Sequence, residues 1–221
     1  LGRRLELKTQ ATETMLRMLA ALGMLVVYEG RYQLTAVARS YLLRESPFYW
    51  GHVWSLTVDM SPTHSRLRDA VAINPAPAPK ATTVSDDDTA VEAWESGQIG
   101  DEQAGRIARF MNSHSMAAAV GLAHEVPFEG AKRLLDVGGG SGCFSIALAQ
   151  RYPDLRCTIM DLPAMCRQAQ KYVDGAGLAQ RIDTRSVDMF REAWPQGYDA
   201  IFFSNIFHDW SFETCAELAT K

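Results

Sequence analysis

The stretch LLDVGGGSG, at residues 134–142, decides how the second half of this chain folds. It begins as a buried strand that contains one acid, Asp136, and it ends as a turn made almost entirely of glycine. Glycine lets the backbone turn sharply and approach a ligand closely, and the amides at the start of a following helix attract polar groups. The stretch therefore predicts a strand, a ligand-binding turn and a helix, with Gly138 and Gly140 beside the ligand.

From residue 132 onward, short apolar runs alternate with helical segments. We expect strands in KRLLDVG, LRCTIMDL, RIDTRSVD and YDAIFFSN, and helices in CFSIALAQRY, in AMCRQAQKYVDGAG and from near Ser211. Continuously apolar strands joined by helices are typical of a parallel sheet that is covered on both faces. The prediction is an α/β, Rossmann-like domain over residues 131–221.

The spacing of the glycines indicates which ligand the turn binds. A dinucleotide fingerprint has small residues in the pattern G-x-G-x-x-G/A. Counted from Gly138, the third small position is Cys143, and counted from Gly140 it is Ser145. Neither count fits, so the turn favours S-adenosylmethionine over a dinucleotide.

Acids at the ends of the next two strands would complete a nucleoside site. Asp161 ends the second strand, where a carboxylate can accept hydrogen bonds from both ribose hydroxyls. In VDMF, Asp188 could accept the adenine amino group, while Met189 and Phe190 offer apolar surface to the ring. Acids often end strands and Met-Phe is often core, but ligands of open α/β sheets bind where the carboxyl ends of the strands meet.

The N-terminal part predicts a different, mainly helical domain. Residues 9–23 read as a helix, residues 24–35 as a tight β-hairpin, and AVARSYLL as a second helix. This order is typical of a winged-helix module, which either binds DNA or serves packing and dimerisation. Residues 1–45 hold seven Lys/Arg against four Asp/Glu, and the first helix carries only Arg17, so we favour packing.

Two segments offer contacts for a substrate. PFYWGHVW, which contains Trp50 and Trp54, is dense in aromatic side chains that either pack in a core or line an aromatic pocket. Residues 101–122 predict a long helix that carries Met111 and His114. A buried core histidine is the ordinary explanation of His114, and a pocket contact is the functional one.

The long helix is expected to connect the two domains. Its predicted apolar stripe consists of Ile107, Phe110, Met111, Ala118 and Leu122. Before it, NPAPAPKATTVSDDD at residues 74–88 is typical of an exposed loop. We place the winged-helix-like domain at residues 1–100, the connecting helix at 101–130 and the cofactor domain at 131–221.

The overall composition argues against several classes of protein. A net charge of −4 is unlike a surface that coats nucleic acid. No apolar run approaches the roughly 20 residues of a membrane span, and the N-terminus does not read as a signal peptide. The four cysteines are scattered without a CxxC pair, so we expect no metal site, no disulfides and a cytoplasmic location.

Taken together, LLDVGGGSG, DLP, VDMF and HDW resemble the class I S-adenosylmethionine-dependent O-methyltransferases. The resemblance is closest to the group of caffeic acid, acetylserotonin and bacterial natural-product O-methyltransferases. It implies a methyltransferase domain that binds S-adenosylmethionine, preceded by a dimerisation domain that helps to line the substrate pocket. It also implies a seven-stranded sheet, so we expect a longer protein with three more strands, and with the acids that orient the catalytic histidine, beyond residue 221.

The same resemblance implies roles for individual residues. His208 matches the catalytic base, and an imidazole can take a hydroxyl proton near neutral pH, although by position alone it could equally cap a helix or pack. Ser204 and Asn205 stand where the family often has Lys or Arg, and would bind the cofactor without a cation. Asp209 and Trp210 are expected to shape the next helix and to pack. Further cofactor-binding positions match Gly138, Asp161, Asp188 and Met189.

The predicted function is methyl transfer from S-adenosylmethionine to a hydroxyl of a small aromatic or polyketide-like molecule. We expect a homodimer formed through the N-terminal domain, with neither nucleic acid nor membrane as a partner. Two alternatives remain: a C- or N-methyltransferase, or a non-methylating enzyme, on the same fold, and a winged-helix regulator.

Overall fold

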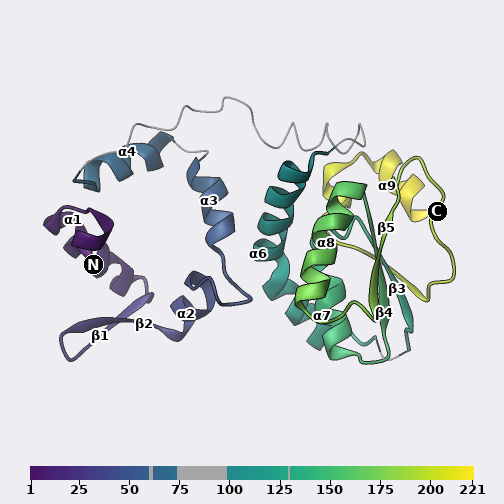
Figure 1. Ribbon diagram of the computed structural model, residues 1–221, viewed down its shortest axis with the longest axis horizontal. Coiled ribbons are helices and arrows are strands. Elements are labelled where there is room, and N and C mark those ends of the chain that lie inside the picture. Colours follow the sequence, from purple (N-terminus) through teal and green to yellow (C-terminus); the bar gives the residue numbers. More distant parts are fainter. Residues whose placement is uncertain (60–61, 74–98, 129) are drawn as a thin grey trace. The chain divides into compact units, whose positions relative to one another are not determined.

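The computed structural model describes residues 1–59, 62–73, 99–128 and 130–221. The chain divides into two compact units, Leu1–Thr83 and Val84–Lys221, and Figure 1 shows the elements of each. The loop predicted over residues 74–88 lies outside the described residues. Among the described helices, none has the length and apolar character needed to cross a membrane.

The first unit follows the predicted order of helix, hairpin and helix. Its elements are η1 (Gly2–Leu5), α1 (Thr9–Ala21), β1 (Leu25–Tyr28), β2 (Arg31–Leu34), α2 (Ala36–Leu42), α3 (Gly51–Asp59) and α4 (Pro62–Val71). Glu29 and Gly30 both have positive φ values, 50° and 72°, which is the backbone of a tight turn between antiparallel strands. The Thr35 side chain caps α2 by accepting a hydrogen bond from the Ala38 amide at 3.2 Å.

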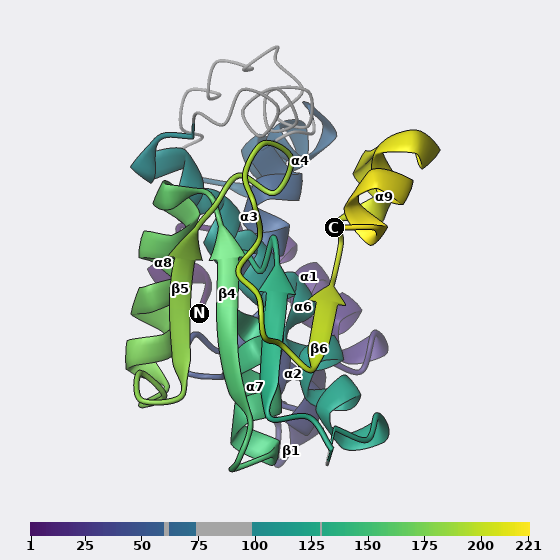
Figure 2. The same ribbon diagram turned by 90° about the vertical axis from the view of Figure 1, so that its right-hand side faces the viewer.

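The second unit contains the predicted parallel sheet. Its strands β3 (Arg133–Val137), β4 (Arg156–Asp161), β5 (Ile182–Ser186) and β6 (Ala200–Phe203) lie in the order β5-β4-β3-β6 and are all parallel. The helices are α6 (Asp101–Glu125), α7 (Cys143–Arg151), α8 (Pro163–Gly175) and α9 (Phe212–Ala219). Figure 2 shows α7 and α8 along one face of the sheet and α9 beyond the end of β6. The prediction of an α/β domain is therefore confirmed.

Alternate residues of β3 face two different cores, as the two-residue period of a strand requires. Leu134 is buried in a cluster with residues of α6, α7 and α8, including Ala119 and Val173. Leu135 and Val137 are buried in a second cluster, which α9 and the segment before β6 close. Both faces of the strand are therefore buried, which explains its continuously apolar sequence.

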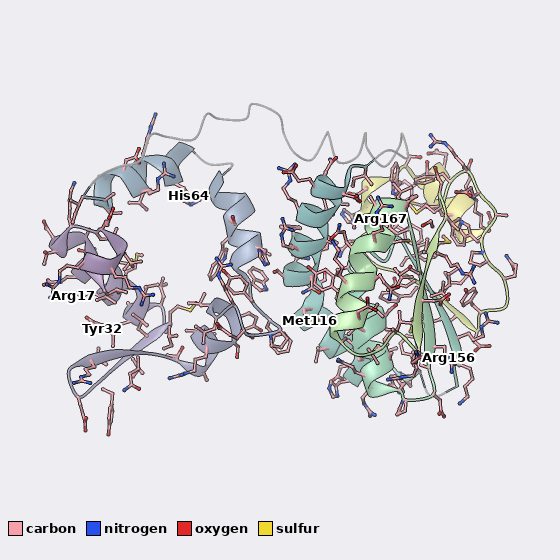
Figure 3. The ribbon with its side chains drawn as sticks, viewed as in Figure 1. Arg17, Tyr32, His64, Met116, Arg156 and Arg167 are labelled. Atoms are coloured by element: carbon pink, nitrogen blue, oxygen red, sulfur yellow. The ribbon has the colours of Figure 1, made fainter. Side chains whose placement is uncertain are left out.

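The predicted apolar stripe of α6 is half-buried at Ile107, Phe110, Met111 and Leu122, but it is wrong at Ala118 and it misses the most buried residues. The buried residues of this helix are the small ones Ala104, Gly105, Ala108, Ser113, Ser115, Ala119 and Ala123, whereas Ala118 is exposed. Small side chains let α6 pack closely against α7 and α8, so size rather than hydrophobicity sets its buried face. Figure 3 labels Arg167 of α8, whose guanidinium donates to Asp101 at the start of α6 at 2.6 and 3.0 Å. His114 is exposed, so it is not a buried core histidine.

Substitution of Gly142 by alanine is expected to lower the free energy of unfolding by about 1–3 kcal/mol. Gly142 has a φ of 75°, and an added Cβ would collide with Cδ1 of Ile159. The matched control is Gly121→Ala on α6, where φ is not left-handed and no atom meets the new Cβ. Chemical denaturation followed by circular dichroism measures both. Equal stability of Gly142→Ala and the parent chain would contradict the strained turn.

Candidate functional site

The glycine-rich turn after β3 has the backbone that its sequence predicts. Gly138, Gly140 and Gly142 have φ values of 64°, 60° and 75°. These lie in the left-handed region, which residues other than glycine rarely adopt. A Cβ on Gly138 would collide with Cδ1 of Ile206, whereas a Cβ on Gly140 would meet no atom within 4 Å. Glycine at position 138 is thus favoured by the positive φ and by the nearby Ile206 side chain, whereas the space beside Gly140 is open.

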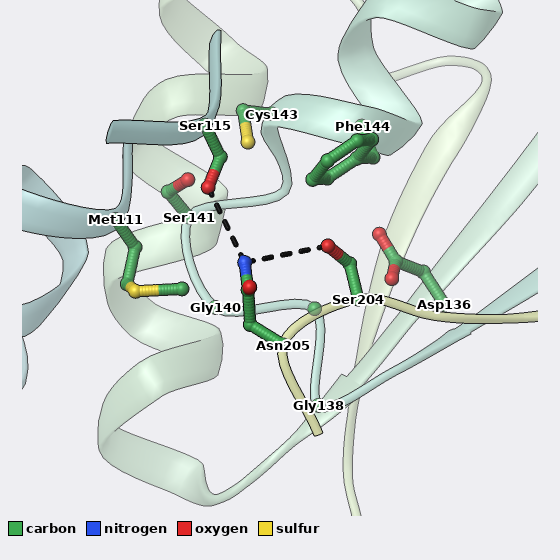
Figure 4. Close-up of a pocket in the computed structure, with 11 residues that line it drawn as sticks. Met111, Ser115, Asp136, Gly138, Gly140, Ser141, Cys143, Phe144, Ser204 and Asn205 are labelled. Carbon is green, nitrogen blue, oxygen red and sulfur yellow. Dashed lines mark hydrogen bonds between the residues drawn. The ribbon is translucent and has the colours of Figure 1, made fainter. Parts of the chain in front are cut away.

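A hollow lies at this turn, at the carboxyl ends of β3 and β6 (Figure 4). Strand β4 lies on one side of β3 and β6 on the other, so the chain reverses its direction of winding there. Open α/β sheets bind their ligands at this switch point. The hollow is lined by Met111, Ser115, Asp136, Gly138, Gly139, Gly140, Ser141, Cys143, Phe144, Ser204 and Asn205.

The lining brings together five of the residues predicted from sequence and adds others. Gly138, Gly140, Met111, Ser204 and Asn205 all line it, from three separate parts of the chain. Sequence reasoning assigned no ligand role to Ser115, Ser141, Cys143 or Phe144, although Ser141 lies inside the quoted turn. The Ser141 hydroxyl oxygen is buried without a hydrogen-bond partner among the described residues, apart from the weakly polar Cys143 thiol.

Two buried carboxylates lie behind the turn. Asp136 is 2% exposed and accepts a hydrogen bond from the Ser145 hydroxyl at 2.7 Å. Asp161 is 6% exposed and accepts hydrogen bonds from the Gly140 amide at 2.9 Å and the Leu162 amide at 2.7 Å. Burial raises the pKa of each carboxyl to about 6, because the charged form loses solvation. Asp161 does not line the hollow itself, but it holds the amide of Gly140, which does.

The VDMF segment is folded on itself. Asp188 accepts hydrogen bonds from the Phe190 amide at 2.9 Å and the Arg191 amide at 3.2 Å, and it pairs with the Arg191 guanidinium at 3.0 Å. Met189 and Phe190 pack against the second core, and neither lines the hollow. Sequence reasoning missed Lys221, whose ammonium donates to the carbonyls of Met189 and Phe190 at 2.7 and 2.8 Å. No local signal could have found that contact.

One wall of the hollow joins α6 to the segment after β6. The Asn205 side-chain amide donates to the Ser115 hydroxyl at 3.5 Å and to the Ser204 hydroxyl at 3.4 Å, as Figure 4 shows. Asn205 has a φ of 54°, which is uncommon for a residue other than glycine, and its side chain is held by these two contacts. His114 reaches the wall from outside, with its Nδ1 at 3.2 Å from the Ser115 hydroxyl and its ring stacked on Phe110.

His208 lies in the short helix η2 (Phe207–Asp209), outside the lining of the hollow. Its side chain is 64% exposed, and its Nε2 is 3.1 Å from a carboxylate oxygen of Asp209. We expected Asp209 to shape the start of α9, but Ser211 caps that helix by accepting from the Thr214 amide at 3.2 Å. Trp210 packs against the Phe190 ring with centroids 4.6 Å apart, as expected of a packing residue.

Trp50 and Trp54 belong to the first unit. The Trp50 amide donates to the Tyr41 carbonyl at 2.9 Å, and Trp54 is 42% exposed on α3. Over the described part of the chain, no group of three or more His, Cys, Asp or Glu residues could hold a metal ion.

The known proteins that this chain is similar to include several named as methyltransferases. A 3-hydroxy-5-methyl-1-naphthoate 3-O-methyltransferase of Streptomyces sahachiroi is 33% identical over 214 residues, which cover 95% of this chain and 58% of the relative. An L-tyrosine C(3)-methyltransferase of Streptomyces lavendulae is 28% identical over 229 residues, which cover this whole chain and 60% of the relative. Human N-acetylserotonin methyltransferase, solved in complex with SAM, is 18% identical, with a TM-score of 0.69 over 96% of this chain and 60% of that one.

These comparisons differ in what they show. The structural likeness shows the fold, and the chain spans about three fifths of the length of each of these proteins. The family model of the O-methyltransferase domain matches residues 66–221, which is more than half of the sequence. On that match, which includes the glycine turn, the buried acids and the segment around His208, the chain belongs to the O-methyltransferase family.

Proposed function

We propose that this protein transfers a methyl group from S-adenosylmethionine to a hydroxyl of a small aromatic or polyketide-like molecule. The observation that carries the proposal is the hollow at the switch point of the sheet, built on the left-handed glycine turn of a chain in the O-methyltransferase family. The residues fit the cofactor, because Gly140 borders open space and the buried Ser141 hydroxyl lacks a strong partner. When bound, S-adenosylmethionine supplies an activated, electrophilic methyl group.

The chain's own residues would hold the cofactor in four ways. Gly138 and Gly140 let the backbone approach it, and Asp161, at the end of β4, offers carboxylate lone pairs to the ribose hydroxyls. Asp188, with Met189 and Phe190, would serve the adenine after the segment opens from its contact with Arg191. Ser204 and Asn205 supply uncharged hydrogen-bonding groups from the end of β6.

His208 is proposed to take the proton from the acceptor hydroxyl. The contact with Asp209 favours the tautomer in which Nε2 carries the hydrogen and donates it to the carboxylate. The lone pair is then on Nδ1, which can accept the proton as general base. Asp209 further stabilises the imidazolium that forms, because the opposite charges are adjacent. This contact supports the proposal that Asp209 orients the base.

The first unit is proposed to be a winged-helix dimerisation domain, with Trp50 and Trp54 as candidate acceptor contacts, and Met111 and His114 are the candidates in the second unit. Support comes from the order of helix, hairpin and helix, and from the exposed apolar side chains of Met18 on α1, a helix with no buried residue, and of Leu22 directly after it. We further propose that the protein is a homodimer and that it acts in the cytoplasm. Strong DNA binding that falls steeply with salt would instead favour a regulator.

Carbon methylation is the second candidate. It is favoured by the 28% identity, over this whole chain, to a relative named as an L-tyrosine C(3)-methyltransferase. The two reactions differ in the atom of the acceptor that gains the methyl group.

Acceptor pairs that differ only in one hydroxyl test the proposed reaction. Phenolic acceptors, including hydroxynaphthoates, are incubated with the protein and S-adenosylmethionine, together with analogues in which hydrogen replaces the hydroxyl. We expect a mass gain of one CH₂ group only for the hydroxyl-bearing member of each pair, with fragmentation placing it on oxygen. Fragmentation that places the added CH₂ group on a ring carbon would establish carbon methylation instead.

A further inference from the structure

Asp188 lies beside the acid that is proposed to serve the ribose. It follows β5, and the amide of Val187 donates to the carbonyl of Asp161 at 3.1 Å, because β4 and β5 are neighbouring strands. The Asp161 carboxylate in turn accepts a hydrogen bond from the Gly140 amide, and Gly140 lines the hollow. A ligand that extends from the hollow past Asp161 would therefore reach Asp188 next.

The two carboxylate oxygens of Asp188 have different kinds of partner. Oδ1 accepts hydrogen bonds from the backbone amides of Phe190 and Arg191 at 2.9 and 3.2 Å. Oδ2 accepts from Nη1 of the Arg191 guanidinium at 3.0 Å. Backbone amides two and three residues further on fix the aspartate side chain as part of the turn, whereas a guanidinium on a flexible stem can move away. Oδ2 is therefore the oxygen that can exchange its partner for a ligand.

The backbone around this pair is held by contacts of its own. The Met189 carbonyl accepts from the Trp194 indole at 2.9 Å, and the Asp188 amide donates to the Glu192 carboxylate at 2.7 Å. The Arg191 side chain, by contrast, is 60% exposed. The contact with Oδ2 can therefore open by movement of the Arg191 side chain alone.

We propose that Arg191 is a specificity-determining residue that competes with the adenine amino group of the cofactor for Oδ2 of Asp188. The inference rests on the proposed function, in which Asp188 serves the adenine. Both competitors are planar N–H donors, and the Asp188 side chain is only 13% exposed, so a second donor reaches Oδ2 by displacing the first. Each binding event then breaks an ion pair before it makes the adenine contact, which lowers the affinity for a ligand that carries the amino group.

The opposite role makes the opposite prediction. If the guanidinium stayed in place and oriented the carboxylate for the adenine, removal of Arg191 would weaken binding. Competition predicts instead that removal of Arg191 strengthens binding, and only for a ligand with the amino group. A ligand without that group makes no demand on Oδ2, so the ion pair can persist while it binds.

Calorimetric titration of the full chain with two ligands tests the inference. These are S-adenosylhomocysteine, which has no net charge at neutral pH, and its analogue in which hydrogen replaces the adenine amino group. Arg191→Met keeps an apolar stem of similar length and removes every donor. We expect it to bind S-adenosylhomocysteine about three- to fivefold more tightly than the parent chain does, as for loss of an exposed ion pair. Its affinity for the analogue should stay within about 1.5-fold of the parent value.

Arg185→Met is the matched control. Arg185 is similarly exposed and also pairs with an acid, Asp183, at 3.4 Å on β5. The variant removes the same charge from the same part of the chain but leaves Asp188 and its partner intact. Both affinities should therefore equal those of the parent chain. An equal gain in both arginine variants would show that general charge, and not competition for Oδ2, is responsible, and would contradict the inference.

A measurement on the parent chain needs no substitution. Salt screens an exposed ion pair more than a hydrogen bond from a neutral amino group. The preference of the parent chain for S-adenosylhomocysteine over the analogue should thus rise about twofold between low and high salt. If Arg191→Met binds S-adenosylhomocysteine no more tightly than the parent, or gains equally for both ligands, the inference is wrong and the cofactor site stands. If S-adenosylhomocysteine does not bind the parent chain at all, the proposed cofactor site fails and the inference fails with it.

Discussion

Replacement of His208 by alanine is expected to lower the rate of methyl transfer by about 10²–10⁴-fold while S-adenosylmethionine binds with nearly unchanged affinity. The rate should fall because the imidazole proposed to take the hydroxyl proton is lost. Affinity should persist because His208 is 64% exposed and does not line the hollow. Steady-state assays with a phenolic acceptor measure the first effect, and calorimetric titration measures the second.

His124→Ala is the matched control for the base. His124 is also exposed, at the end of α6, and the proposed reaction does not use it, so this variant should keep full activity. Asp209→Asn should give an intermediate loss, because Nε2 keeps an acceptor but the imidazolium loses its counter-charge. Unchanged turnover in His208→Ala would show that His208 is not the general base, and it would leave the proposed cofactor site standing.

Replacement of Gly140 by valine is expected to weaken S-adenosylmethionine binding by at least about a hundredfold. The new side chain would project into the open space beside Gly140, which the proposed function fills with cofactor. The φ of 60° would add strain of roughly 1–2 kcal/mol, so the protein should be less stable but still folded. Calorimetry measures the affinity, and chemical denaturation measures the free energy of unfolding.

Gly177→Val separates strain from the loss of ligand space. Gly177 has a φ of 70° and likewise meets no atom within 4 Å of an added Cβ, but it lies in the turn after α8, outside the lining. The two variants should lose similar stability, and only Gly140→Val should lose affinity. Equal affinity of both variants would show that the space beside Gly140 does not hold the cofactor.

Much of the second unit could be predicted from local sequence because its signals are local. Continuous apolar runs determine β3, β4 and β6, and glycines, which adopt positive φ without steric cost, determine the turn at Gly138. A hairpin in the first unit was equally predictable, since Glu29 and Gly30 supply a tight turn between two short strands. In each case the interactions that decide the conformation lie within a few residues.

The buried face of α6 could not be predicted in the same way. Hydrophobic periodicity pointed to the large residues, Phe110 and Leu122 among them, which are only half-buried. The fully buried residues of α6 are small ones such as Ala108 and Ala119. Close approach of three helices over one sheet is a property of the assembled layers. The periodicity of a single helix's sequence therefore does not reveal which of its residues will be buried.

The sequence by itself determined the parallel sheet, the glycine turn and the acids at the ends of β4 and β5, because strand period and backbone sterics act over short distances. Only the tertiary structure decided which polar groups share a space. It joined Ser115 to Asn205 across 90 positions, turned Asp188 toward Arg191, and placed Asp136 in the lining of the hollow. Burial and charge balance depend on all the elements that meet at the switch point, so they appear only when the sheet is assembled.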